Sequence, residues 1–141
     1  MDTRGLVLWA VNGAMTAAAF LLTAVRYRLL ADPLPVHWGF RGEPDGWLPR
    51  RFGAWLMPGL LLGLQVFWAG MRRGVAAAPA GPGVLLRLGW TQTATSAFLL
   101  CVIVLMLDAG MSTRGRIAKT IWVAIALFVA ALVGGAMAGA H

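Results

Sequence analysis

Four long apolar runs, separated by polar segments, most constrain what this chain can fold into. A helix needs about 20 apolar residues to cross roughly 30 Å of hydrocarbon. Each run reaches that length, and none carries a charged residue or a histidine in its interior. The sequence therefore predicts an all-α integral membrane protein, a four-transmembrane-helix bundle that forms a single domain over residues 1–141. The predicted helices cover residues 5–25, 52–71, 88–107 and 120–140.

Composition also indicates that the chain lies in a lipid bilayer. With 60% hydrophobic residues, 12% charged residues and a mean hydropathy of +0.76, a chain of 141 residues cannot hide its apolar surface inside a globule. We expect the lipid bilayer to be its main partner. The net charge of +7 does not indicate nucleic acid, because the basic residues lie in short segments beside the apolar runs.

Basic residues also predict an orientation. Eight of the 12 arginines and lysines lie on the side of the bundle that carries the segment between the first two runs. By the positive-inside tendency this side is expected to be cytoplasmic, with both termini outside.

The polar segment between the first two runs, residues 32–51, is where we expect a binding site. Residues 32–35 contain two prolines and favour an extended path, because a residue before proline avoids the helical region. Residues 43–46, Glu-Pro-Asp-Gly, have the chemistry of a tight turn. We predict a compact, Ω-like flap whose polar side chains converge. The binding candidates are His37, Trp38, Arg41, Glu43, Asp45, Trp47, Arg50 and Arg51.

Three of these residues suggest metal chemistry as an alternative. Imidazole and carboxylate groups suit zinc or manganese, so His37, Glu43 and Asp45 could hold a divalent metal. The competing interpretation is that the two carboxylates make turn and salt-bridge contacts with nearby arginines. No other cofactor is predicted. Because no nucleophile or oxyanion cradle is evident, we expect a binding protein rather than an enzyme and assign no catalytic residue.

The second apolar run contains Pro58, followed by Gly59. Proline removes a backbone donor and clashes with the preceding turn. The sequence therefore predicts a helix that is kinked or split near residues 54–58, with residues 48–57 lying partly along the membrane interface.

Polar side chains inside the first three runs form a predicted layer, displaced toward the side opposite the 32–51 segment. Two interpretations stay open: hydrogen bonding between helices, or a polar half-cavity open to that side. Because the runs contain no carboxylate or histidine, proton-coupled transport is disfavoured. The layer comprises Asn12, Thr16, Gln65, Gln92, Thr95 and Ser96.

Two GxxxG spacings, Gly59 with Gly63 and Gly135 with Gly139, permit close helix contact. Such contacts can form within one chain or between two chains. These spacings therefore leave open whether the protein forms a homo-oligomer.

The segment Leu34-Pro35-Val36-His37-Trp38, followed by Gly42-Glu43-Pro44-Asp45-Gly46-Trp47, resembles a bacterial membrane domain family of unknown function. That domain forms the N-terminal part of SdpI-type immunity proteins. The resemblance implies a small multi-pass protein of the bacterial inner (plasma) membrane. In the best-known member it further implies protection against a secreted peptide toxin and signalling to a repressor. The Gly-x-Arg-Thr-type motif of the second half of those proteins is absent from this sequence.

From residues and resemblance together we expect a non-enzymatic, immunity-type binding module. Its partner would be a peptide, a lipid or a membrane protein, recognised through residues 34–47. The alternative is a metal-dependent site, catalytic or sensory, at the three residues named above.

Overall fold

The computed structural model describes residues 3–77, 82–112 and 120–137. Four helices account for most of these residues, and a two-stranded antiparallel sheet connects the first two helices. A short 3-10 turn, Tyr27–Leu29, leads from the first helix into the sheet. The elements are α1 Thr3–Arg26, β1 Leu34–Trp38, β2 Pro44–Leu48, α2 Arg50–Ala77, α3 Pro82–Met111 and α4 Thr120–Met137.

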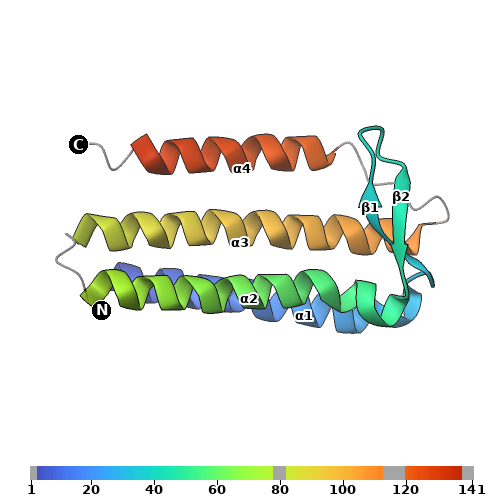
Figure 1. Cartoon of the computed structure of the whole chain (residues 1–141), viewed down its shortest axis with the longest axis horizontal. Helices are drawn as coiled ribbons and strands as arrows, with labels where there is room; N and C mark the ends of the chain where they lie inside the picture. Colours follow the sequence, from blue (N-terminus) through green and yellow to red (C-terminus); the bar gives the residue numbers. More distant parts are fainter. Residues whose placement is uncertain (1–2, 78–81, 113–119, 138–141) are drawn as a thin grey trace.

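Helices α1, α2 and α3 pack against one another, and α4 packs against α3 (Figure 1). The sheet lies across one end of this bundle, which we call the hairpin end. At the other end, called the opposite end, α2 finishes and α3 begins. The helices therefore place the connecting strands far from the residues where α1 starts.

Three helices are long and apolar enough to cross a membrane: Gly5–Leu29, Arg50–Ala77 and Gly83–Met111. In α4 the described apolar stretch, Val123–Val133, is shorter. Large apolar side chains also face outward, among them Val25 at 70% and Leu127 at 66% exposure. A bundle of apolar helices with apolar outer faces is what a helical membrane protein needs.

Helices α2 and α3 are longer than their apolar runs. α2 continues to Ala77 and α3 begins at Pro82, so both helices extend into the stretch between the predicted helices 52–71 and 88–107. Apolar runs end at the first charge, whereas a helix continues past it because a long arginine side chain can bend back toward polar surroundings. Composition alone therefore ended the second predicted helix too early and began the third too late.

The predicted split of the second helix is wrong, whereas the alternative of a kink near Pro58 stays a prediction. α2 is continuous from Arg50 to Ala77, with Pro58 buried inside it, and residues 50–57 are part of the same helix. A proline removes one intrahelical hydrogen bond and destabilises an isolated helix by about 3 kcal/mol. Burial of Gly53, Ala54 and Leu61 on the same helix offsets that loss.

The apolar core joins the helices to the sheet. Leu34 from β1 is completely buried together with side chains from all three packed helices. Because a strand residue belongs to the core, the hairpin is fixed to the bundle. The core comprises Ala19, Leu30, Leu34, Ala54, Leu61, Ile103, Met106 and Leu107.

Candidate functional site

The polar segment between α1 and α2 folds as a β-hairpin. Four pairs connect the strands: Leu34 with Leu48, Pro35 with Trp47, His37 with Gly46, and Trp38 with Pro44. The turn lies at residues 39–42. Its backbone bonds run from the Gly42 amide to the Gly39 carbonyl, 2.9 Å, and from the Gly39 amide to the Glu43 carbonyl, 3.0 Å.

The turn predicted at residues 43–46 is wrong, since Pro44, Asp45 and Gly46 belong to β2. Gly42 supplies the turn instead, with a φ of 74° that glycine adopts without strain. Gly46 is needed for close approach between strands, because a Cβ there would lie 2.9 Å from the Cβ of His37. Pro44 lies in a strand with a single neighbour, where a missing donor is tolerated. The segment is thus a hairpin rather than an Ω-like flap.

Glycines in two helices seat the base of the hairpin. A Cβ on Gly53 of α2 would lie 3.1 Å from Cγ1 of Val36 and 3.3 Å from Cδ2 of Leu34. A Cβ on Gly110 of α3 would clash with Cδ1 of Leu34. The Gly110 carbonyl also accepts a hydrogen bond from the Ala31 amide, 2.9 Å. These contacts fix the position of the hairpin on α2 and α3.

Arg50 connects the hairpin to the start of α2. Its backbone amide donates to Oδ1 of Asp32 at 3.1 Å, and its Nη1 donates to the Leu30 carbonyl at 3.1 Å. The guanidinium lies 5.2 Å from the ring centre of Tyr27. Although Arg50 was a binding candidate, these contacts give it a positioning role.

The outer surface of the hairpin carries the remaining candidates. His37 Nδ1 and Asp45 Oδ1 lie 2.5 Å apart, with their side chains 74% and 53% exposed. Trp47 is 52% exposed, and Phe40 at the turn is 91% exposed. Phe40 was missed because an aromatic residue in a polar segment carries no motif. Arg41, Glu43 and Arg51 are exposed too, whereas Trp38 packs against the core.

In residues 3–77, 82–112 and 120–137, no three His, Cys, Asp or Glu side chains are grouped so that they could hold a metal ion. The structure brings His37 and Asp45 together, while Glu43 does not complete a set of three. Metal binding here stays a prediction.

The predicted polar layer includes a hydrogen-bonded chain between α2 and α3. Gln92 Nε2 donates to Gln65 Oε1 at 2.6 Å, and Gln65 Nε2 donates to Ser96 Oγ at 3.0 Å. Arg72 Nη1 adds a bond to Gln92 Oε1 at 3.3 Å. Gln92 and Ser96 are buried, so these bonds satisfy groups that lipid cannot.

Asn12 makes a separate connection between α1 and α3. Its Nδ2 donates to Thr93 Oγ1 at 2.9 Å and to the Leu8 carbonyl at 2.7 Å. Thr16 and Thr95 instead donate to carbonyls of their own helices. The prediction missed Thr93 and Arg72. Arg72 could have been found from its place one residue after an apolar run, within reach of the amides.

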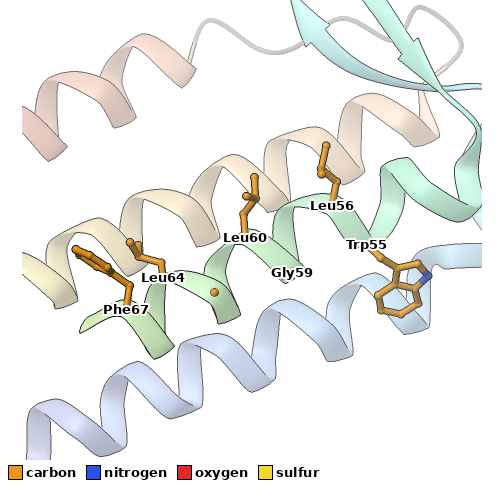
Figure 2. Close-up of a pocket in the computed structure, with 7 residues that line it drawn as sticks. Trp55, Leu56, Gly59, Leu60, Leu64 and Phe67 are labelled. Atoms are coloured by element: carbon orange, nitrogen blue, oxygen red, sulfur yellow. The ribbon is translucent and has the colours of Figure 1, made fainter. Parts of the chain in front are cut away.

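Gly59 and Gly63 face away from the rest of the chain. A Cβ on either would meet no atom within 4 Å. They lie in a shallow apolar groove along α2, with Trp55 toward one end and Phe67 toward the other (Figure 2). This GxxxG spacing makes no contact with another described helix. Gly139 of the second spacing lies outside the described residues.

The fold and the site define a bundle of apolar helices with a β-hairpin at one end, an architecture suited to a membrane protein. Residues 14–62 match the family described as Domain of unknown function (DUF1648). The match covers the second half of α1, the hairpin and the first half of α2. No curated protein and no solved structure matches the chain.

Proposed function

We propose that this protein is a non-enzymatic membrane module that binds a peptide or a partner membrane protein on the outer surface of its hairpin. The observation that carries the proposal is the division of the hairpin into two faces. Leu34 is buried in the core, while Phe40 and Trp47 are 91% and 52% exposed. Exposed aromatic side chains on a rigid support are typical of protein-binding surfaces.

Polar groups on the same surface add specificity. His37 and Asp45 form a pair on the strands, Trp47 is exposed two residues after Asp45, and Arg41 is exposed in the turn. In the described sheet each strand has one strand neighbour, so an extended segment of a partner can pair with a free strand edge. An aromatic and polar surface beside an open edge suits a peptide better than a small molecule.

A photo-reactive amino acid at position 40 tests the proposal in native membranes. The matched control carries it at Val66, which is 67% exposed on α2. We expect a discrete cross-linked protein or peptide from position 40 that disappears with Trp47→Ala. If both positions gave lipid adducts and no protein or peptide adduct, the proposal would be contradicted.

The resemblance to the N-terminal part of SdpI-type proteins supports a narrower form of this proposal, in which the partner is a secreted toxic peptide. This form requires the hairpin end to face outward, opposite to the orientation that the basic residues predict. Cells that express the protein should then survive a peptide toxin of the kind such proteins counter. The Trp47→Ala variant should lose that protection while reaching the same membrane level. Equal survival of cells with and without the protein would remove the immunity role and leave the binding role intact.

The contact between His37 and Asp45 favours one alternative, a metal-dependent site. A histidine held at Nδ1 by a carboxylate leaves Nε2 for a metal. Metal analysis of purified parent protein, His37→Ala and Asp45→Ala separates the two functions. Bound metal in the parent that is absent from both variants would support the alternative, and no metal in any preparation would remove it.

A further inference from the structure

An apolar pocket lies at the opposite end of the bundle, far from the hairpin. It has a volume of about 400 Å³ and is lined by Thr3 and Val7 on one side and by Leu86 and Trp90 on the other, with Leu8 between. Val7 is 54% exposed and Trp90 is 56% exposed. The pocket therefore opens on the outer surface between α1 and α3.

The guanidinium group of Arg72 lies near Leu8, one of the residues that line this pocket. From the position of a Cβ on Gly89, Leu8 Cδ1 would be 2.8 Å away and Arg72 Nη2 would be 3.2 Å away. Both distances start from the same point, so Arg72 Nη2 lies within about 6 Å of Leu8 Cδ1, an atom of a pocket-lining residue. The space that allows this approach exists because residue 89 has no side chain.

Arg72 has no acidic partner among the described residues. Its Nη1 bonds to the neutral side chain of Gln92, and the described ion pairs are Arg26 with Asp108 and His37 with Asp45. Arg73 and Arg87 are exposed at the same end. The described acidic residues, Asp32, Glu43, Asp45 and Asp108, all belong to the hairpin end. The described part of the opposite end is therefore uniformly positive.

We propose that this pocket binds an anionic phospholipid. The acyl chain lies along Val7, Leu8 and Leu86, where apolar contact favours it. The phosphate is held by Arg72 and Arg87, since guanidinium groups bind phosphate with charge-assisted hydrogen bonds. A zwitterionic lipid offers the same phosphate but adds a cation beside it, so net negative headgroups are preferred.

Native mass spectrometry of the purified full chain tests the proposal, with phosphatidylglycerol and phosphatidylcholine as probes. We expect the parent to retain phosphatidylglycerol preferentially. Arg72→Gln should weaken this binding about fivefold, because one arginine near a charged lipid contributes about 1 kcal/mol. The matched control Arg73→Gln removes the same charge from an exposed neighbour and should change binding less than about twofold.

Two further variants keep the test decisive if Arg72→Gln fails to fold. Arg87→Gln removes the exposed charge that follows the lining residue Leu86 in sequence, and Val7→Phe fills the pocket without changing charge. Both should reduce phosphatidylglycerol retention. Equal retention of the two lipids by the parent would overturn the proposal. So would full retention by Val7→Phe, or a loss with Arg73→Gln as large as that with Arg72→Gln, because either result indicates charge attraction without a defined site.

Discussion

The two ends of the bundle are built in opposite ways. At the hairpin end the buried side chain is apolar, Leu34 at 0% exposure, and the polar pair His37 and Asp45 lies outside. At the opposite end polar side chains are buried too, with Asn12 and Gln92 each 2% exposed together with Leu8 at 8%, and Trp90 lies outside at 56%. Each arrangement places its outer groups in the solvent that suits them, water at one end and hydrocarbon or headgroups at the other. The exposed polar groups of the hairpin end therefore include a histidine and a carboxylate, whereas the exposed charges described at the opposite end are arginines.

The largest expected effect comes from filling the glycine notch at the hairpin end. In Gly110→Ala the new methyl group clashes with the fully buried Leu34, and overpacking of a tight core should destabilise the protein by about 2–3 kcal/mol. The control Gly63→Ala adds the same methyl group where no atom lies within 4 Å. It should be neutral or stabilising by up to about 1 kcal/mol. Titration with SDS in mixed micelles, followed by far-UV circular dichroism, measures both, and equal values would show that the hairpin is loosely seated.

A smaller effect is expected from the polar interior of the opposite end. Gln92→Leu leaves Gln65 and Arg72 without their bonds to residue 92 and should destabilise the protein by about 1–2 kcal/mol. The double variant Gln65→Leu/Gln92→Leu should lose less stability than the sum of the losses of the two single variants, because two leucines need no hydrogen-bond partners. The control Thr95→Val removes a bond within one helix and should change stability by less than about 0.5 kcal/mol. If Thr95→Val matched Gln92→Leu in the same SDS titration, the bonds between helices would have no special weight.

At the start of α2, the carboxylate of Asp32 accepts a hydrogen bond from the Arg50 amide. Asp32→Ala leaves that first amide without its acceptor and should cost about 1 kcal/mol. Asp32→Asn keeps an acceptor oxygen at the same place, so its loss should be about half as large. Thermal unfolding in detergent measures both variants. Identical losses would mean that the contribution comes from charge rather than from the bond.

The polar interior of the opposite end was accessible from sequence. Asn12, Gln65 and Gln92 share a depth, and amides in hydrocarbon need one another whatever the details of packing. Thr93 escaped prediction because a threonine can satisfy itself on its own helix, as Thr95 does. Nothing in the sequence separates the two threonines before the helices are packed.

The hairpin end was less accessible, because its structure depends on contacts distant in sequence. Glu-Pro-Asp-Gly has turn chemistry, yet Gly46 is needed because a side chain there would clash with His37 on the other strand. Likewise α2 continues through Pro58 because neighbouring helices bury it, which local propensity does not contain. The prediction of an extended path over residues 32–35 held for Leu34 and Pro35, which begin β1, because proline restricts the preceding backbone by itself, but it was wrong for Asp32 and Pro33, which form a bend.

The smallest expected effect concerns the ion pair between Arg26 and Asp108, whose charged atoms lie 2.6 Å apart at the hairpin end. The Asp108 side chain is 55% exposed, so a double-mutant cycle with Arg26→Gln and Asp108→Asn should give a coupling of only about 0.2–1 kcal/mol. Water and salt screen such a pair, and the coupling should fall between about 0.05 M and about 1 M salt. The neutral pair Gln65 and Gln92 should keep its coupling over the same range. If both couplings fell, or neither did, the two ends would share one solvent and the contrast between them would fail.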